Sequence, residues 1–302
     1  MNRKAVIFGI KSIKLTSEER ILLKETKPWG IILFSRNIEN FEQLRKLIRE
    51  IKITMQDTKY PILIDQEGGR ISRLNKIIDF SLFSQAFFGN LYIKNRKKFY
   101  YYYKIYIEKV SSIFKDVGIN INTAPVLDVL GNQNNTLIGD RSFSKNPKSV
   151  SDLGSLCIKL FNKNKIGTVM KHIPGHGSTI QDSHFTLPVV NKNKKELERK
   201  DFLPFRICKP FFAMTAHVLY KVYDPNFVAT HSKIIIEKVI RKHMKFKGLL
   251  ISDDISMKAL RFNIKENTTL ALEAGCNLIL HCNGNIKEMK KIANIVPKID
   301  NF

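Results

Sequence analysis

Residues 248–254 of the chain read GLLISDD, a short apolar run that ends on two carboxylates. Short apolar runs bounded by polar residues are typical of strands that are buried on both faces of a parallel sheet. Residues 168–172, TVMKH, have the same form and end on a lysine and a histidine. Because an unpaired charge is costly to bury, strands that finish on ionisable groups indicate an edge of the sheet that performs chemistry.

This pattern recurs along the whole chain. Eight such runs lie at residues 5–10, 30–34, 61–65, 119–128, 168–172, 211–217, 248–253 and 277–282, and an amphipathic stretch follows most of them. Strands that alternate with helices predict an α/β protein, and eight units in 302 residues predict a (β/α)8 TIM barrel. A doubly wound open sheet is the competing architecture, but no GxGxxG follows the first run. No linker rich in Pro, Gly or Ser divides the chain, so we expect a single catalytic domain over residues 1–302.

The chain is strongly basic. Its 51 Lys and Arg against 27 Asp and Glu give a net charge of +24, which on its face suggests a nucleic-acid partner. The lysines are spread from Lys4 to Lys298 and do not form one stripe, so we expect no specific binding of nucleic acid. The run YYYY at residues 100–103, beside Lys97 and Lys98, resembles an aromatic, basic platform for nucleic acid. We expect it to be one helix turn of mixed exposure.

Other features of the composition exclude several classes of protein. A hydrophobic fraction of 43% is ample for a buried core, which excludes a disordered chain. No apolar stretch approaches the roughly 18 residues that would span a bilayer. The apolar run at residues 5–10 is too short for the core of a signal peptide, and four scattered cysteines without a CxxC pair suggest neither a zinc ribbon nor a disulfide scaffold. We expect a cytoplasmic monomer with no membrane partner.

Three motifs carry the chemistry. Residues 171–177 read KHIPGHG and are followed by DSH at 182–184, residues 65–70 read DQEGGR, and residues 252–254 read SDD. Together they resemble the glycoside hydrolase family 3 β-N-acetylhexosaminidases, in particular the single-domain bacterial enzymes that trim N-acetylglucosamine from recycled cell-wall fragments. Further matches lie at residues 124–128 (APVLD), 138–143 (IGDRSF), 214–220 (MTAHVLY), 247–257 (KGLLISDDISM) and 271–280 (ALEAGCNLIL).

The resemblance implies a function. It indicates a retaining exo-β-N-acetylglucosaminidase, a β-hexosaminidase that removes terminal GlcNAc from peptidoglycan-derived muropeptides in cell-wall recycling. The implied substrate is a small glycan of the GlcNAc-anhydro-muramyl peptide class, and the enzyme would need neither a cofactor nor a metal.

The nucleophile is the first role that the chemistry requires. A retaining glycosidase forms a covalent glycosyl-enzyme on a carboxylate, and the end of a buried strand can hold that carboxylate rigidly. By resemblance, the nucleophile is the first aspartate of the SDD motif, Asp253. We expect its neighbour Asp254 to cap the helix that follows.

Proton transfer is the second role. By resemblance, the proton donor and acceptor is a histidine on a loop, His184, assisted by Asp182 two residues earlier. An imidazole can give and take a proton near neutral pH, and a neighbouring carboxylate orients it. Residues 173–186 suit a loop because proline, glycines and small polar residues interrupt regular structure.

The remaining polar strand ends are interpreted as a sugar clamp. By resemblance, five residues bind the terminal GlcNAc: Asp65, Arg73, Arg141, Lys171 and His172. A carboxylate such as Asp65 can accept from two hydroxyls of one ring, while the basic side chains donate to hydroxyl and carbonyl oxygens. We expect Gly68 and Gly69 to form a tight turn beside the sugar. Asp128 and His217 are expected to hold neighbouring groups, and His176 to shape the loop or to touch substrate.

Two alternatives stay open at this point. A metal-dependent hydrolase could use His172, His176, Asp182 and His184 as ligands, since these residue types bind zinc. Against this, the stretch from His172 to His176 contains Pro174 and Gly175 and so cannot lie on one helix face. The other alternative is a basic, nucleic-acid-associated protein without catalysis.

Overall fold

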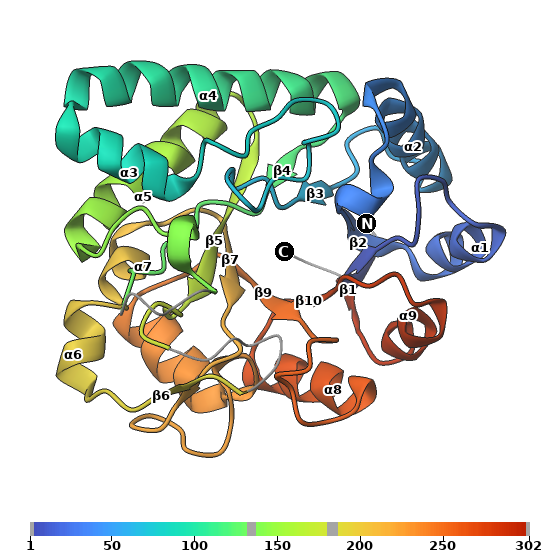
Figure 1. Cartoon of the computed structure of the whole chain (residues 1–302). Helices are drawn as coiled ribbons and strands as arrows, with labels where there is room; N and C mark the ends of the chain where they lie inside the picture. The colour runs from blue at the N-terminus through green and yellow to red at the C-terminus, as the bar shows by residue number, and fades with distance from the viewer. Residues whose placement is uncertain (1–2, 132–136, 180–186, 300–302) are drawn as a thin grey trace.

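The computed structural model describes residues 3–131, 137–179 and 187–299, and a closed barrel of eight parallel strands lies at its centre (Figure 1). In chain order the strands are β1 (Arg3–Gly9), β2 (Pro28–Leu33), β3 (Ile62–Ile64), β4 (Ile121–Asn122), β5 (Gly167–Ile173), β7 (Phe212–Thr215), β9 (Leu249–Asp254) and β10 (Leu278–His281). Each pairs in parallel with the next, and β10 pairs back onto β1, with Ile7 opposite Leu280. The predicted (β/α)8 barrel is confirmed, and each of the eight predicted runs overlaps one of its strands.

Helices surround the barrel on its outer side (Figure 1). They are α1 (Ser17–Thr26), α2 (Phe41–Thr54), α3 (Gln85–Lys94), α4 (Arg96–Val117), α5 (Pro147–Lys163), α6 (Lys194–Arg199), α7 (Leu203–Ile207), α8 (Ile264–Ala274) and α9 (Ile286–Ala293), together with a π-helix, η4 (Ile235–His243). Two short strands, β6 (Val189–Val190) and β8 (Leu219–Tyr220), pair outside the barrel, and β11 (Lys298–Ile299) runs antiparallel to β1.

The fourth strand is much shorter than the predicted run at residues 119–128. The β4 ladder covers only Ile121 and Asn122, and the chain then continues beside β5 through single hydrogen bonds. Leu127 N–H donates to the carbonyl of Lys171, and Lys171 N–H donates to the carbonyl of Pro125. Pro125 has no N–H to offer a ladder, so an apolar run that contains it does not form one continuous strand.

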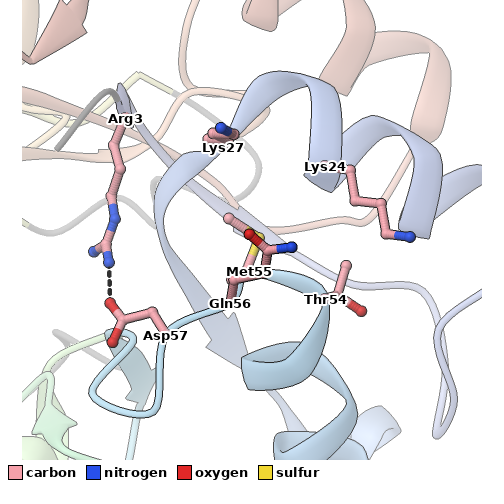
Figure 2. A pocket seen from close by; sticks show the side chains of 7 residues that line it. All are labelled: Arg3, Lys24, Lys27, Thr54, Met55, Gln56 and Asp57. Atoms are coloured by element: carbon pink, nitrogen blue, oxygen red, sulfur yellow. Dashed lines mark hydrogen bonds and ion pairs between the residues drawn. The ribbon is translucent and has the colours of Figure 1, made fainter.

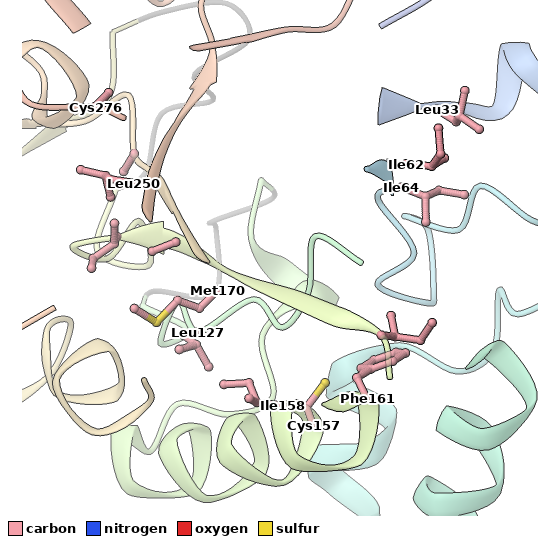
Figure 3. Close-up of a cluster of buried hydrophobic side chains, with 14 of the residues drawn as sticks. Leu33, Ile62, Ile64, Leu127, Cys157, Ile158, Phe161, Met170, Leu250 and Cys276 are labelled. Carbon is pink, nitrogen blue, oxygen red and sulfur yellow. The ribbon is translucent and has the colours of Figure 1, made fainter. Parts of the chain in front are cut away.

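Both faces of the strands are buried. One cluster fills the barrel and includes Ile7, Leu63 and Ile251, while neighbours along the same strands point outward to the helices. The outer cluster between sheet and helices is shown in part in Figure 3, where Cys157, Ile158 and Phe161 of α5 are drawn together with Met170 of β5. Because side chains alternate along a strand, burial on both sides explains why the sequence runs are almost continuously apolar.

The tyrosine run lies on α4 as one turn of mixed exposure. Tyr103 is buried in the outer cluster, whereas Tyr100, Tyr101 and Tyr102 are at least half exposed. This matches the expectation from the sequence, since only one residue of four consecutive helical positions here faces the core.

An ion pair lies at the end of the barrel where the strands begin. Arg3 at the start of β1 forms an ion pair with Asp57 in the loop before β3 (Figure 2). The Arg3 guanidinium also lies over the ring of Tyr60, 4.9 Å from its centroid. Lys24 and Lys27 line the same hollow, and Lys24 points away from this pair. Across the part of the chain that the structure describes, none of the helices has the length and apolar character needed to cross a membrane.

Candidate active site

At the opposite end of the barrel, where the strands finish, one hollow gathers most of the predicted site. Six of the eight predicted residues line it: Asp65, Arg73, Arg141, Lys171, His172 and Asp253. They come from the ends of β3, β5 and β9 and from the loops that follow β3 and β4. The other two, Asp182 and His184, lie outside the described residues. Active sites of this fold occur at this end of the barrel, because the carboxyl ends of all eight strands converge there.

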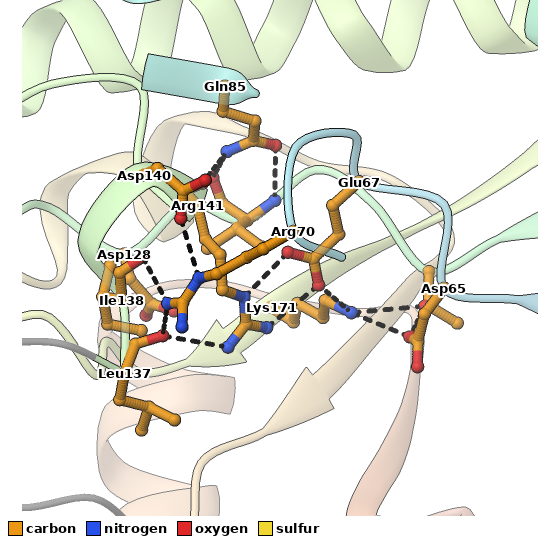
Figure 4. A network of polar contacts seen from close by, with 12 residues as sticks. Asp65, Glu67, Arg70, Gln85, Asp128, Leu137, Ile138, Asp140, Arg141 and Lys171 are labelled. Atoms are coloured by element: carbon orange, nitrogen blue, oxygen red, sulfur yellow. Dashed lines mark hydrogen bonds and ion pairs between the residues drawn. The ribbon is translucent and has the colours of Figure 1, made fainter. Parts of the chain in front are cut away.

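Lys171 stands at the centre of the polar network in the hollow (Figure 4). Its side chain is only 3% exposed, and its Nζ donates to Asp65 Oδ1 at 2.9 Å and forms an ion pair with Glu67 Oε1 at 2.7 Å. Asp65 Oδ1 also accepts from the hydroxyl of Thr123, and Asp65 Oδ2 lies 3.3 Å from Arg73 Nη2. The buried lysine therefore holds two carboxylates in fixed positions.

Glu67 is a member of the network that the sequence analysis missed. Its carboxylate, 1% exposed, receives Arg141 Nε at 2.8 Å and Arg141 Nη2 at 2.9 Å, in a bidentate pair. The pairing fixes the plane of the guanidinium at the hollow. The signal was present in the DQEGGR motif, because an acidic residue two positions after a strand-end carboxylate is poised to reach the same site.

The turn that carries Glu67 into the hollow needs two glycines. Gly68 has a φ of +88° and Gly69 a φ of +60°, conformations that glycine adopts without steric cost. A Cβ on Gly68 would lie 2.2 Å from the carbonyl oxygen of Phe83, and one on Gly69 would lie 2.6 Å from Ser84 Cβ. The tight turn predicted from the sequence is present.

His172 is oriented by a buried carboxylate behind it. Its Nδ1 lies 2.7 Å from Asp128 Oδ2, and its Nε2 lies 3.4 Å from Arg141 Nη2. Asp128, which is fully buried, also accepts from the backbone N–H of His176 at 2.6 Å. The expectation that Asp128 holds neighbouring groups agrees with these contacts, and His176 both shapes the loop and lines the hollow.

Asp253 and Asp254 end β9 with different surroundings. Asp254 Oδ1 accepts from the N–H of Ser256 at 3.0 Å and from the N–H of Cys282 at 3.2 Å. It therefore stabilises a turn and not a helix N-terminus, since the next helix, α8, is capped by Asn263. The helix-capping expectation for Asp254 was wrong, although its carboxylate does bind backbone N–H groups. Asp253 accepts from the N–H of Asp254 at 2.8 Å and lines the hollow.

The ionisation of the site follows from these contacts. Burial would raise the pKa of Asp65, but Lys171 and Arg73 outweigh it and hold that pKa below its usual range. Burial would also raise the pKa of Glu67, but Arg141 and Lys171 outweigh it and lower that pKa to about 2. The pKa of Asp253 is also lowered, because His217 and His172 overcome the effect of burial. All three carboxylates are therefore anions at neutral pH.

His176, unlike these three carboxylates, is kept uncharged by its surroundings. Burial lowers the pKa of its imidazole to about 4, and the nearby Asp128 carboxylate raises it only in part. Its Nδ1 lies 2.9 Å from the hydroxyl of Thr179. The ring is thus neutral at the hollow.

In the described part of the chain, the residues of the metal-dependent alternative are not arranged as a metal site. There, no group of three or more His, Cys, Asp or Glu side chains is arranged to hold an ion. His172 has Asp128 on one ring nitrogen and the Arg141 guanidinium beside the other. A cation on that second nitrogen would be repelled by the arginine. Asp182 and His184, the other two ligands of that alternative, lie outside the described residues.

Comparison with known proteins identifies the chain's relatives. Residues 4–301 match the glycosyl hydrolase family 3 N terminal domain. A beta-hexosaminidase of Neisseria gonorrhoeae is 35% identical over 288 residues, covering 93% of this chain and 78% of that protein. The crystal structure of native NagZ from Neisseria gonorrhoeae superposes with a TM-score of 0.89 at 32% identity, over 100% of this chain and 87% of that one.

A longer relative has the same fold. A family 3 beta-N-acetylglucosaminidase from Paenibacillus superposes with a TM-score of 0.86 at 30% identity, over 96% of this chain. The chain spans 56% of the length of that protein. With a barrel of this kind, a polar hollow at the carboxyl ends of its strands and a family match over almost its whole length, the chain belongs to glycosyl hydrolase family 3, among the β-hexosaminidases, and is a glycoside hydrolase.

Proposed function

We propose that the chain is a retaining exo-β-N-acetylglucosaminidase and that Asp253 is its nucleophile. The observation that carries this proposal is the position of Asp253, an ionised carboxylate at the end of a barrel strand that lines the same hollow as the Asp65–Lys171 and Glu67–Arg141 pairs. An ionised carboxylate is the form that attacks an anomeric carbon. The hexosaminidase relatives support the same reaction class.

The reaction takes two steps. In the first, a carboxylate oxygen of Asp253 bonds to the anomeric carbon while the bond to the aglycone oxygen breaks, and that oxygen takes a proton. In the second, a water loses a proton and attacks the same carbon, which releases GlcNAc and restores the carboxylate. Two displacements at one carbon return its β configuration. The proposed proton donor and acceptor is His184, oriented by Asp182.

The polar network is proposed to bind the sugar ring. Asp65 Oδ2 has one long contact, to Arg73, and so can accept from sugar hydroxyls. Arg141 uses Nε and Nη2 on Glu67, while its Nη1 has only a long contact of 3.5 Å, to the carbonyl of Leu137, so Nη1 can donate to a hydroxyl or to the acetamido carbonyl. Lys171 and His172, each held by a carboxylate, complete the proposed clamp. Holding the donors rigidly removes the cost of ordering them when substrate binds.

The substrate is proposed to be a GlcNAc-terminated fragment of the GlcNAc-anhydro-muramyl peptide class, processed in the cytoplasm during cell-wall recycling. The basic balance of the chain, +24, favours the approach of aglycones that carry carboxylates. Phe34 and Arg73 line the hollow, and the guanidiniums of Arg36 and Arg73 lie 4.7 Å and 5.4 Å from the centroid of the Phe34 ring. We further propose that residues 1–302 act as one catalytic domain and as a monomer.

The test is turnover of an aryl β-N-acetylglucosaminide beside the corresponding β-glucoside. The proposal expects release of aryl alcohol from the first and little from the second, with β-GlcNAc as the first product seen by NMR. Asp253→Ala should remove turnover without loss of folding, and a 5-fluoro glycoside should label Asp253. Asp254→Ala is the matched control and should retain more activity. A first product of α configuration, or a label on Asp254, would overturn the proposal.

A further inference from the structure

On the side of β9 that faces β7, backbone pairing ends before Asp253, and side chains contact the strand from there on. The ladder between β7 and β9 runs from the Phe212–Leu249 pair to the Met214–Ile251 pair. Asp253 and Asp254 lie beyond that last pair, although β7 and β9 remain neighbours in the barrel (Figure 1). The catalytic strand end therefore needs other partners on this side.

Two side chains at and just after the end of β7 supply them. The N–H of Asp253 donates to Thr215 Oγ1 at 3.2 Å. His217 Nε2 lies 3.0 Å from the carbonyl oxygen of Asp254. The two contacts hold the first N–H and the last carbonyl of the Asp253–Asp254 dipeptide.

A third residue, Thr230 of the 3-10 turn η3 (Ala229–His231), joins these two side chains. Its Oγ1 lies 2.8 Å from Thr215 Oγ1 and 2.7 Å from His217 Nδ1. A longer contact of 3.2 Å joins it to the carbonyl of Ala216. Thr215, Thr230 and His217, which we call the bridge, are each 0% exposed, so water does not replace a lost member from the outside.

The two ends of the bridge have fixed hydrogen-bond directions. Asp253 N–H donates to Thr215 Oγ1, and Nε2–H of His217 donates to the Asp254 carbonyl, because a carbonyl oxygen only accepts. Between these two ends, Thr230 Oγ1 is bonded both to Thr215 Oγ1 and to Nδ1 of His217. Because all three side chains are buried, removing the Thr230 hydroxyl leaves Thr215 Oγ1 and Nδ1 of His217 without this partner.

The peptide held by the bridge also holds the carboxylate. The N–H of Asp254, inside the clamped dipeptide, donates to Asp253 Oδ1 at 2.8 Å. A rotation of this peptide would therefore turn the carboxylate with it. The effect of the bridge on Asp253 passes through the backbone, and none of the three bridge residues is among those that line the hollow.

We propose that Thr230 and His217 are positioning residues, which fix the Asp253 carboxylate for attack by clamping the peptide that carries it. This inference rests on the proposed role of Asp253 as nucleophile. The MTAH segment, residues 214–217, would then affect the rate of the glycosyl-transfer step and not the binding of the sugar.

Thr230→Val tests the bridge at its middle, because it removes the hydroxyl and keeps a similar shape. We expect kcat on an aryl β-N-acetylglucosaminide, and the rate of labelling by the 5-fluoro glycoside, to fall by about tenfold or more, since small misplacement of a reacting group is costly. KM should change by less than about twofold, because the sugar clamp is untouched. Thr230→Ser, which restores the hydroxyl, should recover most of the loss.

Thr168→Val is the matched control. Thr168 is also buried, and its hydroxyl has no hydrogen-bond partner among the described residues. Thermal unfolding of both valine variants reports any general loss of stability. Equal kcat for Thr230→Val and Thr168→Val, or a loss in Thr230→Ser as large as in Thr230→Val, would overturn the inference.

A second measurement shows whether the effect passes through Asp253. In Asp253→Ala, added azide takes the place of the missing carboxylate and forms the α-glycosyl azide. Adding Thr230→Val to that variant should leave the azide reaction unchanged, because no carboxylate remains to be positioned. An equal loss in both backgrounds would contradict the inference. Failure of the proposed function would instead appear without any bridge variant, as an inactive wild type or an active Asp253→Ala.

Discussion

The two ends of the barrel use charged side chains for different purposes. At the end where strands begin, the Arg3–Asp57 pair has side chains that are 13% and 22% exposed. At the end where strands finish, the Lys171–Glu67 pair has side chains that are 3% and 1% exposed, and each partner binds a further charged group. The first pair ties a strand to a loop, while the second preserves buried charges in fixed positions.

The difference between the two ends shows where the chain keeps buried charges that do not increase its free energy of unfolding. Burying ions costs several kcal/mol each, and ion pairing at best offsets that cost, so a buried cluster is poor evidence for stability. Hydrophobic residues would serve packing at least as well. Charges retained at such a cost where the strands finish indicate that this end was selected for chemistry.

The largest expected effect concerns the proton donor at the carboxyl end. His184→Ala should lower kcat/KM on a disaccharide-like substrate by roughly 10²- to 10⁴-fold, the usual contribution of general acid–base catalysis. The loss should be much smaller with a dinitrophenyl glycoside, whose leaving group departs without a proton. The measurement is kcat/KM over aryl glycosides of graded leaving-group pKa, with Asp182→Ala expected to follow the same trend. Equal losses on good and poor leaving groups would place the donor elsewhere.

The second prediction compares the ion pairs directly. Glu67→Gln leaves Lys171 and Arg141 without their shared carboxylate, and breaking a buried pair costs about 3–5 kcal/mol in the free energy of unfolding. Asp57→Asn at the other end should cost less, because this pair is only partly buried and solvent screens it more than the Glu67 pairs. Urea unfolding of both variants measures the difference. Similar costs would remove the distinction between the two ends.

Asp57→Asn also serves as the control for activity. It should leave kcat and KM close to wild type, whereas Glu67→Gln should impair sugar binding because the Arg141 guanidinium loses its fixed plane.

The third prediction concerns acid. The pKa of Glu67 falls from an ordinary 4.5 to about 2 in the folded protein. A lowered folded pKa gives stability that is present above pH 4.5 and is lost as the pH falls toward 2, because the unfolded state binds the proton first. Thermal unfolding between these pH values should therefore show a steep decline in wild type. The decline should be shallower in Glu67→Gln, and parallel curves would contradict the assignment.

The smallest effect is expected from the dispersed surface charge. If the +24 charge has no selected partner, affinity for duplex DNA or RNA should be weak, independent of sequence and lost steeply between low and physiological salt. Filter binding at two salt concentrations measures this. Sub-micromolar binding at physiological salt would show that the basic surface, and not only the carboxyl end of the barrel, has a function.

The sequence by itself determined the order of strands and the residues at their ends. Burial on both faces makes each strand a short apolar run, and the polar residue that ends it marks the carboxyl edge. For this reason the sequence alone assigns four strand-end residues to one site: Asp65, Lys171, His172 and Asp253. Asp182 and His184 were assigned from their motif alone, and their roles stay predictions.

Only the tertiary structure decided which charged groups pair. Glu67 meets Arg141 and Lys171 across separations of 74 and 104 positions in the chain, which no local pattern encodes. The bridge from Thr215 through Thr230 to His217 is equally invisible, because a threonine on a distant turn shows no periodic signal. Barrel closure brings these residues together.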